Sequence, residues 1–528
     1  MDMANTSISL DDKFNIKKSN VLLNGTQGLV RLMLGQKLRD EKQGLNTAGF
    51  VTGYRGSPLG AVDFQMRRAS KELLASNIKF KEALNEDLAT TALWGAQQAE
   101  LRGEGLYDGV FGLWYGKGPG VDRSGDAMRH ANMAGSSVNG GVLMAMGDDH
   151  SGESSTVLHQ SDLAMIDAGM PILSPAGVQE ILDYGYYGFA LSRYSGLWVG
   201  LKTMKDTIEV TSVVDGDPFR MRFKNSKPKS GAENLNIRLV DTPADQEKRL
   251  LSDKKIAAEE FARINRIDKV GLPKGNAKIG LVAAGKNWLD LIHSLSLLGI
   301  NELEAKALGI TSYKIVQTWP IDRQSLLEWA DQLDLIIVIE EKRKIIETQI
   351  KDALFSVASK TRVYGGHKND ESLFFDHGVL DPLEIASALG QIFKEEGCSN
   401  NSLELGLKKI IEVQSADNAP DLAERLPYFC AGCPHNSSTI VPEGSRAYAG
   451  IGCHYMAQWM DRETLGFTHM GGEGANWIGE SLFSKRGHVF QNIGDGTYNH
   501  SGIQAIRAAV AANTDITYKI LFNDAVAM

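Results

Sequence analysis

The stretch HVFQNIGDGTY at residues 488–498 decides how the rest of the chain is interpreted. Its apolar residues predict a buried strand, and Gly494 and Gly496 predict a tight turn where that strand ends. Apolar residues then recur at helical spacing from about Ser501 to Ala512, which predicts a helix with one apolar face. A second apolar run ends at Asn523. The order strand, turn, helix, strand is typical of a parallel α/β sheet.

Two oxygen-bearing side chains follow these two strands. Asp495 follows the first, and Asn523, which lies 28 positions later, follows the second. Open α/β sheets bind ligands at the carboxyl ends of their strands, so both side chains are expected to converge on one cation. Mg²⁺ takes oxygen ligands and keeps phosphate oxygens in its shell, and the N–H groups near Gly496 suit a diphosphate. Taken alone, Gly-Asp-Gly is also a common turn.

The bulk properties of the 528 residues indicate a multidomain globular protein. Hydrophobic residues make up 43% and charged residues 23%, and the formal net charge is −9, which argues against nucleic acid as a partner. No apolar run is long enough to cross a membrane, and the amino terminus does not resemble a secretion signal. Four cysteines do not make a disulfide framework. We expect a cytoplasmic protein without a membrane partner.

Three α/β regions alternate with polar stretches along the chain. Alternating strands and helices predict doubly wound, mostly parallel sheets in each of them. We expect a tail at 1–20, a first region at 21–225, a linker at 226–275, a second region at 276–396, a linker at 397–425 and a third region at 426–528. The third region stops directly after its second predicted strand, so we expect it to be incomplete.

The first region contains two segments with candidate functional residues. A strand near residues 48–52 runs into GYRGSPLG at 53–60, which predicts a strand-to-helix loop with Ser57 as a helix cap. A further helix opens with NEDLA at 85–89 and places Glu86 in its first turn. A glutamate in that position usually serves only the helix dipole.

The third region carries two cysteine motifs, CAGCPH at 430–435 and GIGCH at 450–454. Structural zinc would use the three cysteines and one of the two histidines. Thiol redox chemistry would need only Cys430 and Cys433. An iron–sulfur cluster would need a fourth thiolate, and Cys398 is the one cysteine outside the motifs. From these residues alone, zinc and an iron–sulfur cluster are equally supported.

The Gly-Asp-Gly followed by Asn523 resembles the thiamine-diphosphate motif of thiamine enzymes. The usual second asparagine of that motif is Asp524 here. The resemblance implies a multidomain thiamine-diphosphate-binding fold that holds the cofactor with Mg²⁺. The residues that it assigns to the cofactor or its metal are Gly494, Asp495, Gly496, Asn523 and, through its backbone carbonyl, Ala525.

The YRGSP segment at 54–58, followed by Asn85 and Glu86, resembles the pyrimidine-binding domain of 2-oxoacid:ferredoxin oxidoreductases. The resemblance implies that Glu86 is the catalytic glutamate, which hydrogen-bonds the cofactor's pyrimidine ring so that the cofactor can remove its own proton. Ser57 stands where that family has a threonine that contacts the substrate or the cofactor. A loop from Gly147 to Gln160 matches the same domain without implying individual roles.

The cysteine motifs resemble three cluster ligands of the same family, which implies a [4Fe-4S] cluster on Cys430, Cys433 and Cys453. Between the cysteines and the metal motif, Gly471 in HMGGEG at 469–474 is expected to allow a close approach of the cofactor, although a simple turn fits equally well. Cys-Pro-His and the domain order point to the indolepyruvate:ferredoxin oxidoreductase branch. The chain is similar to the first part of its long fused form, and the second region to a transketolase C-terminal-type domain.

This resemblance implies an enzyme that oxidatively decarboxylates an aryl 2-oxoacid to an acyl-CoA and CO₂. The expected partners are the aryl 2-oxoacid, coenzyme A and ferredoxin, which takes electrons through the cluster, and the chain is expected to form a homo-oligomer. One alternative is a non-oxidative thiamine decarboxylase or carboligase, which would be colourless. The other is a non-catalytic subunit with a thiamine-enzyme fold that needs a partner to complete its site.

Overall fold

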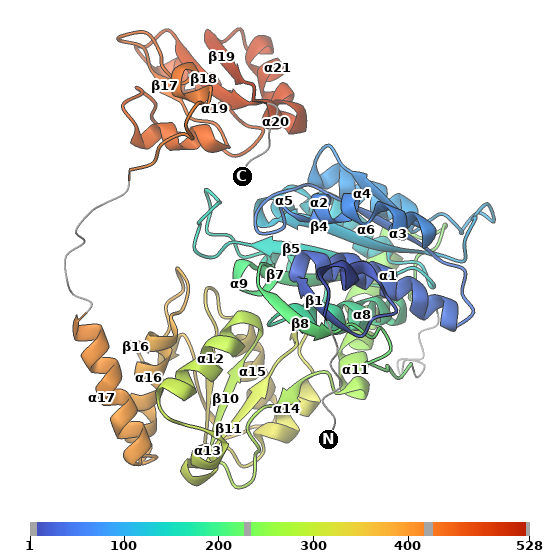
Figure 1. Cartoon of the computed structure of the whole chain (residues 1–528), viewed down its shortest axis with the longest axis vertical. Helices are drawn as coiled ribbons and strands as arrows, with labels where there is room; N and C mark the ends of the chain where they lie inside the picture. Colours follow the sequence, from blue (N-terminus) through green and yellow to red (C-terminus); the bar gives the residue numbers. More distant parts are fainter. Residues whose placement is uncertain (1–7, 226–233, 417–425, 524–528) are drawn as a thin grey trace. The chain divides into compact units, whose positions relative to one another are not determined.

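The computed structural model describes residues 8–225, 234–416 and 426–523 (Figure 1). The chain divides into two compact units, Met1–Asn418 and Ala419–Met528. Each unit is described by itself. Among the described residues, no helix combines the length and the apolar character that a membrane crossing requires.

The first unit is built around a seven-stranded sheet in the order β12-β6-β7-β5-β4-β2-β3. Every neighbouring pair in it is parallel except β12 with β6. Its strands are β2 (Ala48–Gly53), β3 (Ile78–Glu82), β4 (Val110–Lys117), β5 (Val142–Asp148), β6 (Ile172–Leu173), β7 (Trp198–Met204) and β12 (Gln317–Trp319). A separate antiparallel pair joins β1 (Asn20–Asn24) to β8 (Thr211–Asp215).

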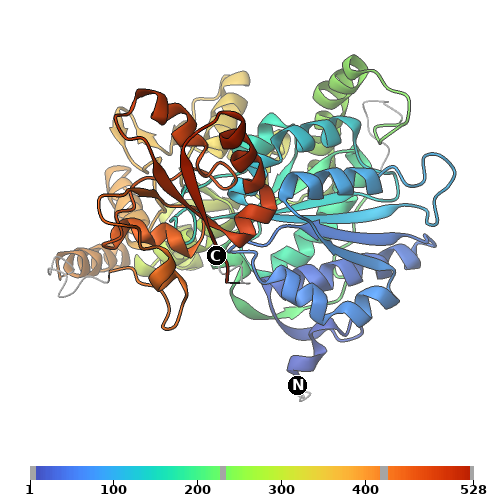
Figure 2. The ribbon, with the colours of Figure 1, turned by 90° about the horizontal axis from the view of Figure 1, so that it is seen from above.

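Helices cover both faces of this sheet (Figures 1 and 2). Alternate side chains of β4 explain why: Phe111 and Leu113 pack with α1 and α8 in one core, whereas Trp114 packs with α4 and α6 in another. The doubly wound prediction is therefore confirmed. The helices of this layer are η1 (Leu10–Phe14), α1 (Gly25–Lys42), α2 (Val62–Arg68), α3 (Ser70–Ala75), α4 (Glu86–Ala96), α5 (Gly118–Arg123), α6 (Gly125–Ala134), α7 (Asp162–Asp167), α8 (Val178–Ser195) and α9 (Lys205–Ile208).

The same unit contains a second large sheet, which has five strands in the order β14-β13-β10-β11-β9. It is parallel apart from β9. Two apolar cores flank it, one under α12, α16 and α17 and one under α14 and α15. Its elements are β9 (Lys269–Val270), β10 (Ile279–Ala283), α12 (Gly285–Leu297), α13 (Glu302–Leu308), β11 (Ile310–Lys314), α14 (Arg323–Ala330), β13 (Leu335–Ile339), α15 (Ile345–Ser356), β14 (Arg362–Tyr364), β15 (His367–Lys368), β16 (Glu371–Ser372), α16 (Pro382–Glu395) and α17 (Asn401–Ala416).

The described parts of both predicted linkers are folded and packed. The first contains α10 (Pro243–Lys248), the π-helix η2 (Arg249–Lys254) and α11 (Lys255–Asn265), and Phe261 of α11 is fully buried in the first core. In the second, Leu403 and Leu407 of α17 are buried against the five-stranded sheet's core. The charged residues that suggested linkers are the solvent faces of amphipathic helices.

The second unit holds a three-stranded parallel sheet in the order β17-β18-β19. Gly494, the last residue of β18, is paired with Leu521, the last residue of β19. Both predicted strands are thus confirmed, and the predicted helix after Gly496 is present. The elements are α18 (His435–Ser438), β17 (Ala447–Tyr448), η3 (Cys453–Trp459), α19 (Ala475–Glu480), η4 (Ser481–Phe483), β18 (Val489–Gly494), α20 (Asp495–Thr497), the π-helix η5 (Tyr498–Gly502), α21 (Ile503–Ala511) and β19 (Ile516–Leu521).

Candidate cofactor and catalytic site

Glu86 lies at the start of α4, as the sequence predicts, and only 5% of its surface is exposed. Asn85 caps the helix, because its side chain accepts a hydrogen bond from the backbone N–H of Leu88 at 3.1 Å. The indole of Trp114 donates to the Glu86 carbonyl at 3.1 Å. These contacts fix the backbone from which the buried carboxyl group projects.

Gly120, in helix α5 just after β4, leaves room for the carboxyl group of Glu86. A Cβ atom at Gly120 would lie 2.6 Å from Oε1 of Glu86, which is closer than atoms that are not bonded can approach. Two residues earlier, a Cβ at Gly118 would lie 2.3 Å from Nδ1 of His159. The start of α5 therefore passes between Glu86 and His159, with a glycine facing each of them.

We expect Gly120→Ala to destabilise the first unit by about 1–3 kcal/mol, because an added methyl group in a packed site forces its neighbours to shift. Gly125→Ala is the matched control, since a Cβ at Gly125, at the start of the next helix α6, meets nothing within 4 Å. Urea unfolding of both variants measures the difference. Equal free energies of unfolding would show that the Glu86 carboxyl group does not depend on Gly120.

Ser57 lies at the same edge of the sheet, in the loop after β2. A Cβ at Gly56 would approach the Lys117 side chain to 3.3 Å, and one at Gly147 would approach Leu59 to 3.1 Å, so this loop covers the carboxyl ends of β4 and β5. Ser57 is half-buried there. The prediction that Ser57 caps a helix is wrong, because α2 begins only at Val62.

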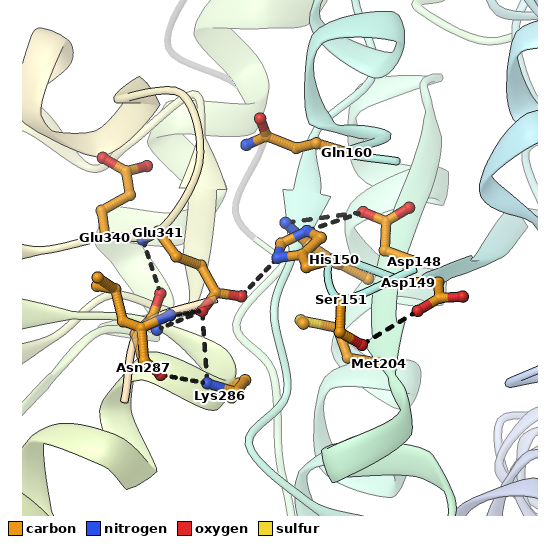
Figure 3. A network of polar contacts seen from close by, with 12 residues as sticks. Asp148, Asp149, His150, Ser151, Gln160, Met204, Lys286, Asn287, Glu340 and Glu341 are labelled. Carbon is orange, nitrogen blue, oxygen red and sulfur yellow. Dashed lines mark hydrogen bonds and ion pairs between the residues drawn. The ribbon is translucent and has the colours of Figure 1, made fainter. Parts of the chain in front are cut away.

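A buried ionic network lies beyond this edge, between the two large sheets of the first unit (Figure 3). His150, just after β5, contacts Glu341, just after β13, with 2.5 Å between Nδ1 and Oε1. Glu341 also accepts from the side chain of Asn287 at 3.2 Å and lies 3.4 Å from the ammonium of Lys286. Burial alone would raise the pKa of Glu341, but the hydrogen bond and charge of His150, with Lys286, hold that pKa below its usual range.

On the other side of His150, Asp148 ends β5 and is fully buried. It accepts from the backbone N–H of Ser161 at 3.0 Å and lies 3.7 Å from Lys202. The cavity beside His150 and Lys286 measures about 40 Å³, which holds a water molecule but no cofactor. This network therefore fastens the two sheets of the unit to one another.

In the second unit, Asp495 and Asn523 follow the carboxyl ends of the adjacent strands β18 and β19. One Asp495 oxygen accepts the backbone N–H of Gly496 at 2.9 Å. The strand register therefore places the two predicted Mg²⁺ ligands at the same edge of the sheet. Ala525, the third predicted ligand, lies outside the described residues.

Two buried imidazoles lie near Asp495. Only 2% of His454 and 3% of His435 is exposed, and their rings approach edge to face with centroids 6.0 Å apart. Burial lowers the pKa of His435, although the charge of Asp495 opposes the shift, and burial lowers the pKa of His454 to about 3. Within the described part of the chain, Nδ1 of His435 and Nε2 of His454 have no hydrogen-bond partner.

Glu473 connects the two loops around these imidazoles. Its buried carboxyl group accepts the N–H of Gly471 at 2.6 Å and that of Ile451 at 3.4 Å. Burial raises the pKa of Glu473 to about 7. Gly471, predicted to approach the cofactor, is thus tied to the loop that precedes Cys453. Glu473 was not among the residues predicted from the sequence, although a single carboxyl group among three glycines indicates a candidate site residue.

The three predicted cluster cysteines lie in two segments: Cys430 and Cys433 precede α18, and Cys453 begins η3. Cys430 is exposed, and Cys433 and Cys453 are half-buried. Burial raises the pKa of the Cys453 thiol, and electrostatic interactions with Cys433 and Cys430 raise it further. In the portion of the chain that is described, no three His, Cys, Asp or Glu side chains are arranged to hold a metal ion. The fourth cysteine, Cys398, belongs to the first unit.

The second unit's residues fit a diphosphate with its Mg²⁺. Two oxygen-bearing side chains follow the carboxyl ends of neighbouring strands, and two buried imidazole nitrogens have no partner among the described residues. The loops around them contain glycines that leave room for a ligand's oxygens. The cysteines supply three of the four thiolates that an iron–sulfur cluster needs.

Two protein families match parts of this chain. The family described as "Indolepyruvate oxidoreductase domain" matches residues 269–417, and the family described as "Thiamine pyrophosphate enzyme, C-terminal TPP binding domain" matches residues 450–528. The indolepyruvate oxidoreductase subunit IorA of Pyrococcus horikoshii is 24% identical over 99% of this chain and 77% of its own length. The chain is homologous to IorA along nearly its whole length. The IorA subunit of Methanothermobacter marburgensis is 23% identical over 91% of this chain and 73% of its own.

A solved structure shows a similar fold. A 2-oxoglutarate:ferredoxin oxidoreductase from Magnetococcus marinus, with 2-oxoglutarate, coenzyme A and succinyl-CoA bound, is similar with a TM-score of 0.50 and 15% identity, over 71% of this chain and 66% of that one. The fold of this IorA homologue is the multidomain α/β fold of thiamine enzymes, and residues 450–528 are its thiamine pyrophosphate binding domain.

Proposed function

We propose that this chain is the thiamine-diphosphate-binding subunit of an oxidoreductase for aryl 2-oxoacids such as indolepyruvate. The reaction converts R–CO–COO⁻ and a coenzyme A thiol into R–CO–S-CoA, CO₂ and a proton, and it passes two electrons to ferredoxin. The proposal is carried by buried Glu86 in the first unit and by Asp495 and Asn523, which follow adjacent parallel strands in the second unit. These are the groups that the pyrimidine end and the diphosphate end of the cofactor require.

The chain's own residues have distinct roles in this proposal. Glu86 would hold a proton on the pyrimidine ring, Ser57 would contact the substrate carboxylate or the cofactor, and the N–H groups of Gly471, Gly494 and Gly496 would face it. Asp495 and Asn523, with the carbonyl of Ala525, would bind Mg²⁺. When bound, thiamine diphosphate supplies the electron sink for decarboxylation, and an iron–sulfur cluster on Cys430, Cys433 and Cys453 supplies one-electron transfer.

The partners follow from the relatives and from the reaction. The IorA relatives are named as subunits, which supports a second, different subunit for this chain, and the structural relative binds coenzyme A. We also propose that the assembly contains more than one copy of this chain. Ferredoxin is the proposed electron acceptor.

One observation favours a second candidate, a non-oxidative thiamine decarboxylase or carboligase. The three thiols of the second unit do not form a finished ligand set among the described residues. In that case the protein would be colourless and would consume the 2-oxoacid without an electron acceptor.

The deciding experiment is anaerobic purification of the full natural chain with its partner subunit, followed by a visible spectrum and analysis of iron, sulfide and zinc. We expect a brown protein whose absorption bleaches when indolepyruvate and coenzyme A are added together. A colourless protein that releases CO₂ from indolepyruvate would instead establish the non-oxidative reaction.

Serine variants test which cysteine thiols bind the proposed iron–sulfur cluster. Cys433→Ser is expected to remove most of the iron and sulfide, because the hydroxyl group is a poor replacement for a thiolate ligand. Cys398→Ser, in the other unit, should keep both. Full iron content in Cys433→Ser would remove the C-x-x-C motif from the proposed cluster.

A further inference from the structure

His454 is buried beside the candidate diphosphate site with an unsatisfied nitrogen. Its Nε2 atom has no hydrogen-bond partner among the described residues, although only 2% of the side chain is exposed. Buried polar atoms in native proteins are nearly always hydrogen-bonded, because leaving one unpaired costs the desolvation of that group. A partner supplied by a ligand is therefore the simplest explanation of this nitrogen.

Three glycines make room for this ring. A Cβ at Gly450 would lie 2.6 Å from Nε2 of His454, one at Gly452 would lie 2.9 Å from Cε1, and one at Gly494 would lie 3.2 Å from Cε1. Gly494 ends β18 and directly precedes Asp495. The imidazole thus lies at the carboxyl end of β18, next to the start of α20 where the predicted metal ligand is found.

The sequence left His454 and His435 open as fourth ligands of a metal bound by the cysteines. The geometry favours a different role for His454, because its Nε2 atom faces Gly450 and its ring lies against Gly494, the residue before Asp495. His435 contacts the His454 ring, with the two ring centroids 6.0 Å apart. Both imidazoles are therefore associated with the carboxyl edge of β18.

We propose that His454 donates a hydrogen bond from Nε2 to a phosphate oxygen of the thiamine cofactor, with His435 beside it, and that neither histidine binds the metal of the cysteines. This inference rests on the proposed function and adds a phosphate-binding residue to it. The N–H of an imidazole is a suitable donor for a charged oxygen.

The test uses the full natural chain with its partner subunit and measures binding by calorimetry. Thiamine diphosphate with Mg²⁺ is titrated into wild type, His454→Ala, His454→Gln and the control His488→Ala. His488 is half-buried, with its Nε2 atom 2.8 Å from the hydroxyl oxygen of Thr517, and lies before the opposite, amino end of β18. Thiamine without phosphates is titrated in parallel, and the iron and zinc content of every variant is determined.

We expect His454→Ala to weaken thiamine diphosphate binding about tenfold or more, the loss typical of a hydrogen bond to a charged group. Its affinity for thiamine and its metal content should not change. His454→Gln should recover part of the loss through its amide N–H, and His488→Ala should bind like wild type.

Three results would overturn the inference. Wild-type affinity of His454→Ala for thiamine diphosphate would show that His454 does not bind phosphate. A loss of iron or zinc in His454→Ala would return the metal role to His454. Equal losses for thiamine and thiamine diphosphate would show a general effect on the fold instead. Failure of the wild-type chain itself to bind thiamine diphosphate would overturn the proposed function, which distinguishes the two failures.

Discussion

Glu86→Gln is expected to lower indolepyruvate-dependent electron transfer about 10³-fold, within the range that one positioned proton-transfer group contributes. Glutamine keeps the size of the side chain that Gly120 accommodates and leaves the Asn85 cap intact, so the fold should not change. What it loses is a carboxyl group that can hold a proton on the cofactor's pyrimidine ring. The measurement is the rate of acceptor reduction by the full natural chain with its partner subunit.

Asp87→Asn is the matched control, because Asp87 is the next residue of the same helix turn. Its carboxylate is 38% exposed and pairs with Arg123 at 3.3 Å, outside the buried pocket of Glu86. Both variants replace a carboxyl group by an amide at the amino end of α4, and only Glu86→Gln changes the buried one. A Glu86→Gln rate within a few-fold of the Asp87→Asn rate would remove Glu86 from the mechanism.

Local patterns in the sequence were sufficient for the parts of the site made by neighbouring residues. Apolar runs located β18 and β19, because strands are encoded over a few residues. The tight turn predicted at Gly494 and Gly496 is absent, since α20 begins directly at Asp495. Asn85 was located as the start of α4 from an equally local pattern. The parallel order of β18 and β19 places Asp495 and Asn523 at the same edge of the sheet.

Contacts between distant residues could not be predicted in this way. His150 and Glu341 are 191 positions apart, and no local pattern pairs them. Residues 226–275 were predicted to be a linker because they carry many charges, although Phe261 of α11 is buried. Residues adjacent in sequence also differ in their surroundings: His454 follows Cys453, which left it open as a ligand of the same metal, and its ring lies among Gly450, Gly452 and Gly494.

Asp495→Ala is expected to weaken Mg²⁺ and thiamine diphosphate binding together, each by about 100-fold or more. Loss of a group in the outer shell of a metal site typically costs 10–100-fold, and a direct carboxylate ligand should cost at least as much. The two losses are coupled because Mg²⁺ is bound through protein oxygens and phosphate oxygens at once. Calorimetry with Mg²⁺ at saturating cofactor, and with cofactor at saturating Mg²⁺, measures both.

Two further variants separate metal binding from the other contacts of Asp495. Asp515→Ala removes an exposed carboxylate just before β19, at the opposite end of the sheet, and should bind both ligands normally. Asp495→Asn keeps an oxygen that can accept the Gly496 N–H, so the start of α20 is retained while the ligand charge is lost. Its affinities should fall between those of wild type and Asp495→Ala. Unchanged affinity for both ligands in Asp495→Ala would contradict the assignment, whereas a loss in Asp495→Ala that Asp495→Asn fully repairs would assign Asp495 to the start of α20 alone.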